Sequence, residues 1–337
     1  MIKLIIHNYN LQLKNPFRIT HVTRTEQPTM IVELKLGSLS GFGEATPISY
    51  YGLNISEMVK TLEGFKATIE KTSFEDPSQF FNSLEPYLKN HPFIQCAVDE
   101  AAHDLYGKIK NKPLYELWGL ENINLPLTNY TIGLGSIEEM IEKIKAMPWP
   151  IYKIKVGTPQ DSEIIEKLRS ITSSIFRIDA NTGWNSENTL QLAHEMKNFG
   201  VEFIEQPLKV SDHESMEKIK SECPLPLIAD ESCQVYQDVE RCKNGFHGIN
   251  IKLMKCGGIT PALKMIKKAR QLGLQVMIGC MTESSIGIAA IGQLLPLLDY
   301  VDMDGPLLIQ NDPGKPLKME FGKVFLSDAP GTGADLI

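Results

Sequence analysis

Six charged residues recur through the second half of the chain, each at the end of a short apolar segment. Neighbouring members are separated by roughly 25 residues, the length of one strand-plus-helix unit, except that the last gap is two units long. Carboxylates and ammonium groups at such positions can bind a metal ion and move protons. The six residues are Lys155, Asp179, Glu205, Asp230, Lys252 and Asp302.

The three consecutive carboxylates are candidate metal ligands. If Asp179, Glu205 and Asp230 converge inside a protein, they repel one another unless a cation neutralises them. Oxygen ligands of this kind favour a hard divalent ion, above all Mg²⁺. Such a site leaves coordination positions open, so it can also accept the carboxylate of a substrate.

The lysines on either side of these carboxylates are candidate acids and bases. Lysine becomes a base near neutral pH when burial and a neighbouring cation lower its pKa. Lys153 lies two residues before Lys155, so both side chains point to the same side of a strand. We expect Lys153 to lower the pKa of Lys155 and to stabilise developing negative charge. Lys155 and Lys252 would then be paired acid/bases, as in a racemase or epimerase.

The elements that position these residues form an alternating pattern of apolar segments and amphipathic, helix-length segments. Eight such units predict an α/β fold, a modified (β/α)8 TIM-type barrel, in which the carboxyl ends of the strands face the active site. In a ring of eight, strands 2 and 6 are opposed, so Lys155 should face Lys252. The predicted strands are 127–132, 151–156, 175–178, 201–204, 225–229, 248–251, 274–279 and 297–301.

The first part of the chain has a different pattern. Predicted strands at 1–13, 29–36 and 41–44 are followed by predicted helices at 56–71 and 92–109. This predicts an α+β capping domain over 1–122, completed by about 312–337, and a barrel domain over 123–311. A further short strand is expected within 317–325.

The motifs at the predicted strand ends resemble those of the enolase superfamily, muconate-lactonizing enzyme subgroup. The resemblance implies Mg²⁺ as cofactor, and it implies that the 317–325 strand returns to the cap. The similar motifs are Lys153-Ile154-Lys155, the segment 177–181, Glu205-Gln206-Pro207, Asp230-Glu231-Ser232, the segment 251–258 and, in the cap, Gly41-Phe42-Gly43-Glu44-Ala45.

Asp302-Met303-Asp304 narrows the resemblance to the dipeptide epimerases, whose Asp-x-Asp pair holds the α-ammonium of the substrate. The implied function is inversion of the α-carbon of the C-terminal residue of an Ala-Xaa dipeptide, through an enediolate. Muconate cycloisomerase and o-succinylbenzoate synthase remain alternatives within the subgroup. A catalytically silent barrel that acts as a binding protein is an alternative of another class.

The resemblance also implies that two loops of the cap, 16–27 and 47–54, close over the barrel and contact the substrate. Relatives that act on Ala-Glu carry an arginine where Val22 stands here, and Arg24 follows two residues later. Either Arg24 serves instead, or the pocket is apolar. We favour neutral or hydrophobic second residues. The expected contact residues are Phe17, Ile19, Val22, Arg24 and Tyr50.

Composition agrees with an enzyme of the cytoplasm. The chain has 337 residues and a net charge of −7, which argues against nucleic acid and anionic membranes as partners. Its six cysteines show no Cys-x-x-Cys spacing and are expected to be reduced thiols. We expect a small dipeptide as partner and a homo-oligomer. Taken singly, Lys252 and Lys255 are also typical of surface charges.

Overall fold

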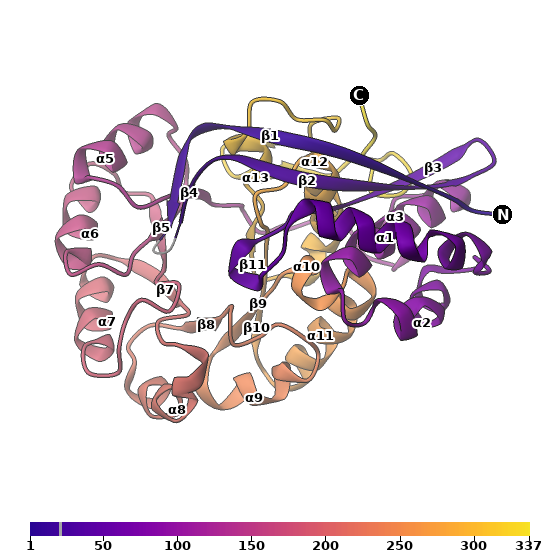
Figure 1. Cartoon of the computed structure of the whole chain (residues 1–337). Coiled ribbons are helices and arrows are strands. Elements are labelled where there is room, and N and C mark those ends of the chain that lie inside the picture. The colour runs from indigo at the N-terminus through magenta and orange to yellow at the C-terminus, as the bar shows by residue number, and fades with distance from the viewer. Residues whose placement is uncertain (20–21) are drawn as a thin grey trace.

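The computed structural model describes residues 1–19 and 22–337, and the side chains of all of these except 17–19 and 22. An antiparallel sheet lies beside a larger parallel barrel (Figure 1). The antiparallel sheet consists of β1 (Lys3–Ile19), β2 (Val22–Leu36) and β3 (Leu39–Ala45).

The eight parallel strands are hydrogen-bonded in chain order, as the sequence predicted. A bridge between Thr128 and Val301 brings the first and last strands together and nearly closes the barrel. The second and sixth strands, β5 and β9, therefore lie on opposite sides. The strands are β4 (Tyr130–Ile132), β5 (Ile151–Lys155), β6 (Ile175–Asp179), β7 (Val201–Glu205), β8 (Leu227–Ala229), β9 (Gly248–Ile251), β10 (Gln275–Gly279) and β11 (Tyr300–Asp302).

Amphipathic helices surround the barrel and bury their apolar sides against its strands. Helix α12 differs, because it is buried along its whole length between the barrel and the cap. Two short helices, α10 (Leu253–Cys256) and α13 (Gly305–Leu308), follow β9 and β11. The longer helices are α5 (Ile137–Ala146), α6 (Asp161–Arg169), α7 (Thr189–Asn198), α8 (His213–Glu222), α9 (Asp238–Gly245), α11 (Ile259–Gln271) and α12 (Ser285–Leu294).

The cap helices are α1 (Ile55–Lys71), α2 (Pro77–Leu88), α3 (Pro92–Lys110) and α4 (Leu114–Leu117). Helices α1 and α3 pack on the antiparallel sheet, and α2 and α4 pack against α3. A Cβ at Gly41 or Gly43 of β3 would overlap the backbone of α3. Only glycine permits this close approach, which explains the two glycines of the Gly-Phe-Gly-Glu-Ala motif. The sequence analysis missed α2.

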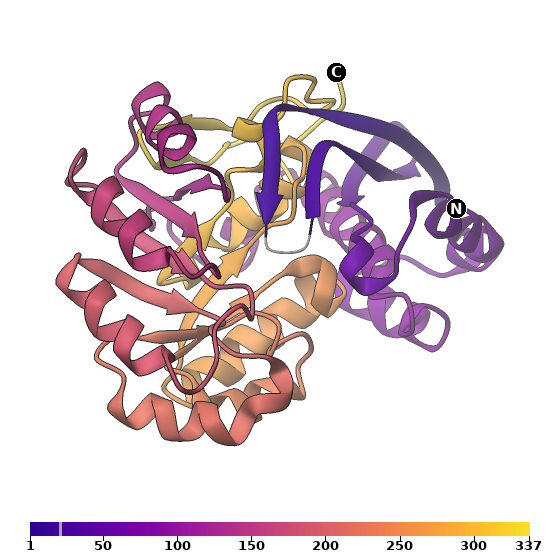
Figure 2. The same ribbon diagram turned by 60° about the vertical axis from the view of Figure 1, so that its left-hand side comes forward.

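Residues 16–19 and 22–27 are not in the loop that we predicted over 16–27, because they belong to β1 and β2; residues 20 and 21 lie outside the described residues. Pairing between β1 and β2 shifts between Gln12 and Phe17 and then resumes, so that Phe17 lies opposite Arg24. Pro16 lacks an N–H group, which fits its place in this irregular stretch and explains why the strand pattern seemed to stop there. The two described strands therefore continue as a long ribbon that reaches over the barrel (Figure 2).

The segment 317–325 was also predicted imperfectly. It forms a hairpin of two strands, β12 (Lys318–Glu320) and β13 (Lys323–Phe325), around a turn at Phe321 and Gly322. The N–H of Thr128 donates to the carbonyl of Gly322 at 2.9 Å, so the turn of the hairpin lies against the start of the barrel. The following residues do reach the cap, where the N–H of Thr332 donates to Asp104 at 2.7 Å.

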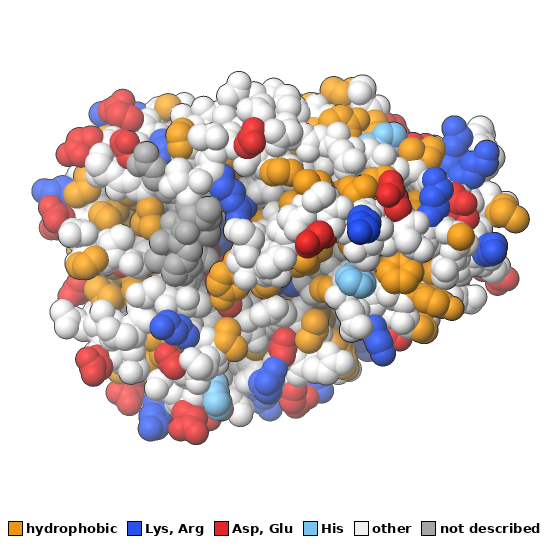
Figure 3. Space-filling view, in the orientation of Figure 1, with side chains coloured by type: hydrophobic (Ala, Val, Ile, Leu, Met, Phe, Trp, Pro, Cys, Tyr) orange, Lys and Arg blue, Asp and Glu red, His pale blue; other side chains and the backbone are white. Residues whose placement is uncertain are grey.

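Acidic and basic side chains are interspersed over the face shown in Figure 3. Within the described chain, no helix is both long and apolar enough to cross a membrane.

Candidate active site

The charged residues predicted at the strand ends converge at the mouth of the barrel, and six of them line one pocket. Asp179 and Glu205 are fully buried and do not line it. Lys155 pairs in register with Asp179, and Asp179 pairs with Glu205, so these three residues lie at one level of neighbouring strands. Asp230 and Lys252 each follow directly after a strand, β8 and β9. The pocket has a volume of about 310 Å³ and is lined by residues of both the barrel and the cap.

Asp179, Glu205 and Asp230 are arranged as metal ligands would be. One oxygen atom from each lies within 4.8 Å of the others, and all three side chains are buried. Burial and the neighbouring charge of Asp179 raise the pKa of Glu205. Burial would also raise the pKa of Asp179, but Lys155 and Lys153 lower it to about 2. This donor set of three convergent oxygens fits a hard divalent cation.

The two candidate acid/base lysines occupy opposite ends of the carboxylate group. The Nζ of Lys155 lies 2.7 Å from Asp179 Oδ2, and the Nζ of Lys252 lies 2.9 Å from Asp230 Oδ2. They come from opposite sides of the barrel, as the strand order requires. Burial would lower the pKa of Lys252, but the charge of Asp230 outweighs it and holds that pKa above its usual range. A substrate carbon between the two lysines would have one on each face.

Lys153 is held more tightly than either of these lysines. Its Nζ lies 2.8 Å from Glu205, 3.0 Å from Asp302 and 3.1 Å from Asp179, and the side chain is 2% exposed. Burial would lower the pKa of Lys153, but these carboxylates raise it well above the usual range. Lys153 is therefore a fixed positive charge, and it shares the Asp179 carboxylate with Lys155.

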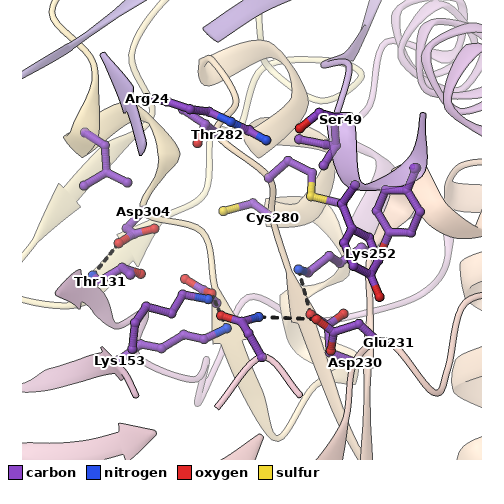
Figure 4. Close-up of a pocket in the computed structure, with 18 residues that line it drawn as sticks. Arg24, Ser49, Thr131, Lys153, Asp230, Glu231, Lys252, Cys280, Thr282 and Asp304 are labelled. Carbon is purple, nitrogen blue, oxygen red and sulfur yellow. Dashed lines mark hydrogen bonds and ion pairs between the residues drawn. The ribbon is translucent and has the colours of Figure 1, made fainter. Parts of the chain in front are cut away.

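Asp304 lies across the pocket from Asp230 and Lys252 (Figure 4). Asp302 lines the same pocket, but the two aspartates are not equivalent. Asp302 accepts from Asn129 at 2.8 Å and from Lys153 at 3.0 Å. Asp304 accepts from the N–H of Thr131 at 2.6 Å, and no lysine or arginine of the described chain forms an ion pair with it. Burial and the charge of Asp302 raise the pKa of Asp304 to about 7. Asp304 is thus the member of the pair that lacks a cation.

Comparison with known proteins agrees with this geometry. Residues 1–119 match the N-terminal domain of mandelate racemase / muconate lactonizing enzyme, and residues 136–337 match the enolase C-terminal domain-like family. The chain belongs to the mandelate racemase/muconate lactonizing enzyme family of the enolase superfamily.

Several members of this family are similar over nearly the whole chain. An L-Ala-D/L-amino acid epimerase from Flavobacterium johnsoniae is 48% identical over 99% of this chain and 100% of its own. Another from a Maribacter species is 50% identical over 99% of each chain. The crystal structure of a dipeptide epimerase from Cytophaga hutchinsonii, complexed with Mg and D-Ala-L-Val, has a TM-score of 0.94 and 27% identity, and covers 100% of this chain and 96% of that one.

The cap residues that we expected at the substrate are only partly described. Arg24 lines the pocket, where its Nη1 donates to Gln27 Oε1 at 2.8 Å and burial lowers its pKa. Tyr50 also lines the pocket, although it is 59% exposed. The side chains of Phe17, Ile19 and Val22 lie outside the described residues. Arg24 therefore lies at the pocket, so the alternative in which it takes the place of the arginine found in Ala-Glu relatives stays open.

The sequence analysis missed several residues of this family site. Glu231 lines the pocket, and its buried Oε2 accepts no hydrogen bond from the described residues. Asn181 and Gln206 adopt left-handed backbone conformations, with φ of 42° and 36°. They lie two residues and one residue after the candidate metal ligands Asp179 and Glu205. Such conformations are uncommon for residues other than glycine and cluster at functional sites. Their positions in the motifs were visible in the sequence, but their backbone conformations were not.

No role was predicted for Lys255, for which a surface charge was one alternative. It is 2% exposed and contacts Asp230. Lys252 is not a surface charge either, since its side chain is only 13% exposed. Its position three residues after Lys252 was the available signal in the sequence. The short helix α10 after β9 directs Lys255 back toward Asp230.

Proposed function

We propose that this protein is a Mg²⁺-dependent dipeptide epimerase that inverts the α-carbon of the C-terminal residue of Ala-Xaa dipeptides. The observation that carries the proposal is the placement of Lys155 and Lys252 at opposite ends of three convergent carboxylates. Inversion requires removal of a proton from one face of a carbon and delivery to the other. A pocket with one amine on each side is suited to that task.

Asp179, Glu205 and Asp230 would hold the metal ion, which supplies positive charge to the substrate carboxylate when it is bound. An α-hydrogen beside a carboxylate is very weakly acidic, because its removal leaves an enediolate with two negative charges. Fixed positive charge that favours the enediolate over the ground state lowers this barrier. Lys153, immobilised by three carboxylates, adds such a charge from the protein itself.

Lys155 and Lys252 exchange the proton of the α-carbon. One lysine removes it, and the other, still protonated, returns a proton to the reverse face. Asp304 holds the α-ammonium of the first residue and so fixes the dipeptide across the pocket. A dipeptide carries its carboxylate and ammonium at opposite ends, and both ends then have a partner.

The relatives support a dipeptide substrate with alanine as the first residue and any of several amino acids as the second. Two of them are L-Ala-D/L-amino acid epimerases, and the neighbouring crystal structure contains a valine dipeptide. We propose neutral or hydrophobic second residues as the preferred substrates. We also propose that Arg24, on the wall of the pocket, admits acidic ones to a lesser degree.

The direct test is proton exchange in D₂O. Protein and Mg²⁺ are incubated with a library of L-Ala-L-Xaa dipeptides, and deuterium at the second α-carbon is measured by mass spectrometry. Exchange with formation of the D-epimer is expected. If no dipeptide exchanges while the protein binds Mg²⁺, the epimerase assignment is wrong. Muconate cycloisomerase and o-succinylbenzoate synthase substrates serve as comparison, because they carry no ammonium for Asp304.

Two further properties are proposed beside the activity. All six cysteines are free thiols, which supports work in the reducing cytoplasm. A homo-oligomer also remains a prediction, and light scattering of the purified protein would test it.

A further inference from the structure

Lys255 lies outside the set of residues that touch the substrate pocket, yet it is one of the most buried charges of the chain. Its side chain is 1% exposed, and it belongs to the short helix α10. A lysine in such a place needs partners that compensate for the loss of water. Those partners are all on the loop that carries Asp230.

The ammonium group of Lys255 has three acceptors. Its Nζ lies 2.6 Å from Asp230 Oδ1, 2.6 Å from the carbonyl oxygen of Asp230 and 3.1 Å from the carbonyl oxygen of Cys233. An ammonium has three N–H donors and no acceptor, so all its donors are used. Lys255 therefore has no donor left for a substrate, and its effect must be exerted through Asp230.

These contacts fix the conformation of Asp230 from two directions. Because one nitrogen binds both the carbonyl and a carboxylate oxygen of the same residue, the side chain cannot rotate without breaking a bond. Gln206 holds the same loop from β7, since its Oε1 accepts from the N–H groups of Asp230 and Ser232 at 3.0 Å. The second carboxylate oxygen, Oδ2, is left on the side of Lys252.

We infer that Lys255 is a positioning residue, which orients the Asp230 carboxylate for the metal ion and for Lys252. The inference rests on the proposed function in so far as Asp230 is a metal ligand. Residues that hold metal ligands from behind typically change metal affinity by about 10- to 100-fold when they are replaced.

Two possible roles of Lys255 predict opposite results. If it only neutralises charge, replacing it by an uncharged side chain leaves one more negative charge at the site and tightens Mg²⁺ binding. If it positions Asp230, the freed carboxylate rotates and Mg²⁺ binding weakens. The sign of the change therefore decides between them.

The experiment is calorimetric titration of the whole protein with Mg²⁺ in the absence of dipeptide. Lys255→Met should weaken binding at least about tenfold. Lys108→Met is the matched control, since Lys108 forms a comparable pair with buried Asp104 at 3.0 Å in the cap. It should leave the Mg²⁺ affinity within about twofold, because its partners Ser40, Asp104 and Asp335 belong to the cap and the C-terminal segment and not to the carboxylate group. Unchanged or tighter binding by Lys255→Met would overturn the inference.

Lys255→Arg keeps the charge and covers the case in which the methionine variant does not fold. The three acceptors converge on one nitrogen, whereas a guanidinium spreads its donors over a plane. Positioning predicts weaker Mg²⁺ binding for this variant too, with turnover largely recovered at saturating Mg²⁺. Affinity equal to that of the unchanged protein would refute it. A protein that binds Mg²⁺ but exchanges no dipeptide would refute the proposed function and leave this inference standing.

Discussion

Replacing Asp304 by asparagine tests which carboxylate recognises the substrate ammonium. Asn has nearly the same shape but no charge. Asp304 is 2% exposed and has no protein cation among the described residues, whereas Asp302 is already paired with Lys153 at 3.0 Å. Losing one partner of a buried charge pair costs about 2–5 kcal/mol. We therefore expect kcat/KM for L-Ala-L-Xaa to fall about 30-fold to several-thousand-fold.

The assay compares each dipeptide with its N-acetyl derivative, which lacks the ammonium. Exchange of the second α-hydrogen is followed by NMR in D₂O for both substrates. Asp304→Asn should remove most of the preference for the free amine and leave the acetylated substrate nearly unchanged. Asp302→Asn is the matched control. It removes a partner of Lys153, so it should lower kcat for both substrates alike.

The pH dependence of this preference follows from the pKa of Asp304, which burial and Asp302 raise to about 7. Below that pH the free protein holds Asp304 protonated, and a neutral carboxyl pairs poorly with an ammonium. The ratio of kcat/KM for free to acetylated dipeptide should therefore fall as the pH drops through 7, and the Asn variant should lose this dependence. If Asp304→Asn lowers kcat/KM equally for the free and the acetylated dipeptide, so that their ratio is unchanged, the reasoning is refuted.

Three other perturbations have defined outcomes. Lys155→Met and Lys252→Met should each stop epimerisation. Each variant should still exchange the α-hydrogen of one epimer, and the two variants should act on different epimers. If both variants lose exchange from the same epimer, the two lysines are not opposed bases. Burial and Glu44 raise the pKa of Glu283 to about 8. Protonated Glu283 therefore contributes fully to the free energy of unfolding below the pKa of the unfolded chain, near 4.5, and this contribution is lost as the pH rises through 8. Urea unfolding from pH 5 to 8 should therefore show stability falling by up to about 1.4 kcal/mol per pH unit more than in Glu283→Gln, and parallel curves would disprove this. Arg24→Met should lower kcat/KM for L-Ala-L-Glu about tenfold relative to L-Ala-L-Val, and an unchanged ratio would exclude a contact with the acidic side chain.

The spacing of charged residues predicted the barrel and the main site because strand order in this fold fixes position. Lys155 and Lys252 had to be opposed once their strands were numbered second and sixth. Periodicity did not reveal the course of the chain at 16–27, where Pro16 disturbs a strand that continues beyond it. It also missed the turn at Phe321 and Gly322, where two residues with positive φ reverse a short strand.

The contacts between cap and barrel were beyond the sequence for another reason. Glu44 of β3 accepts from the N–H groups of Ser284 and Gly287 at the start of α12, more than 200 residues away. Glutamate in a strand predicts an exposed side chain, and only the packed structure places it at a buried helix terminus. The same holds for Lys255, whose partners lie on a loop from a different unit of the barrel.

The charges of the site explain why a metal ion and a zwitterion suit it together. Among the described residues of the site, the carboxylates outnumber the lysines by two: Asp179, Glu205, Asp230, Glu231, Asp302 and Asp304 are accompanied by Lys153, Lys155, Lys252 and Lys255. Two carboxyl groups that line the pocket form no ion pair with a described residue: Glu231 beside the proposed metal ligands, and Asp304 at the opposite end. Burial and neighbouring carboxylates raise the pKa of both to about 7. A divalent ion at one end and an ammonium at the other would compensate both. A substrate without an ammonium would leave Asp304 to be neutralised by a proton, which is why the free amine should be selected.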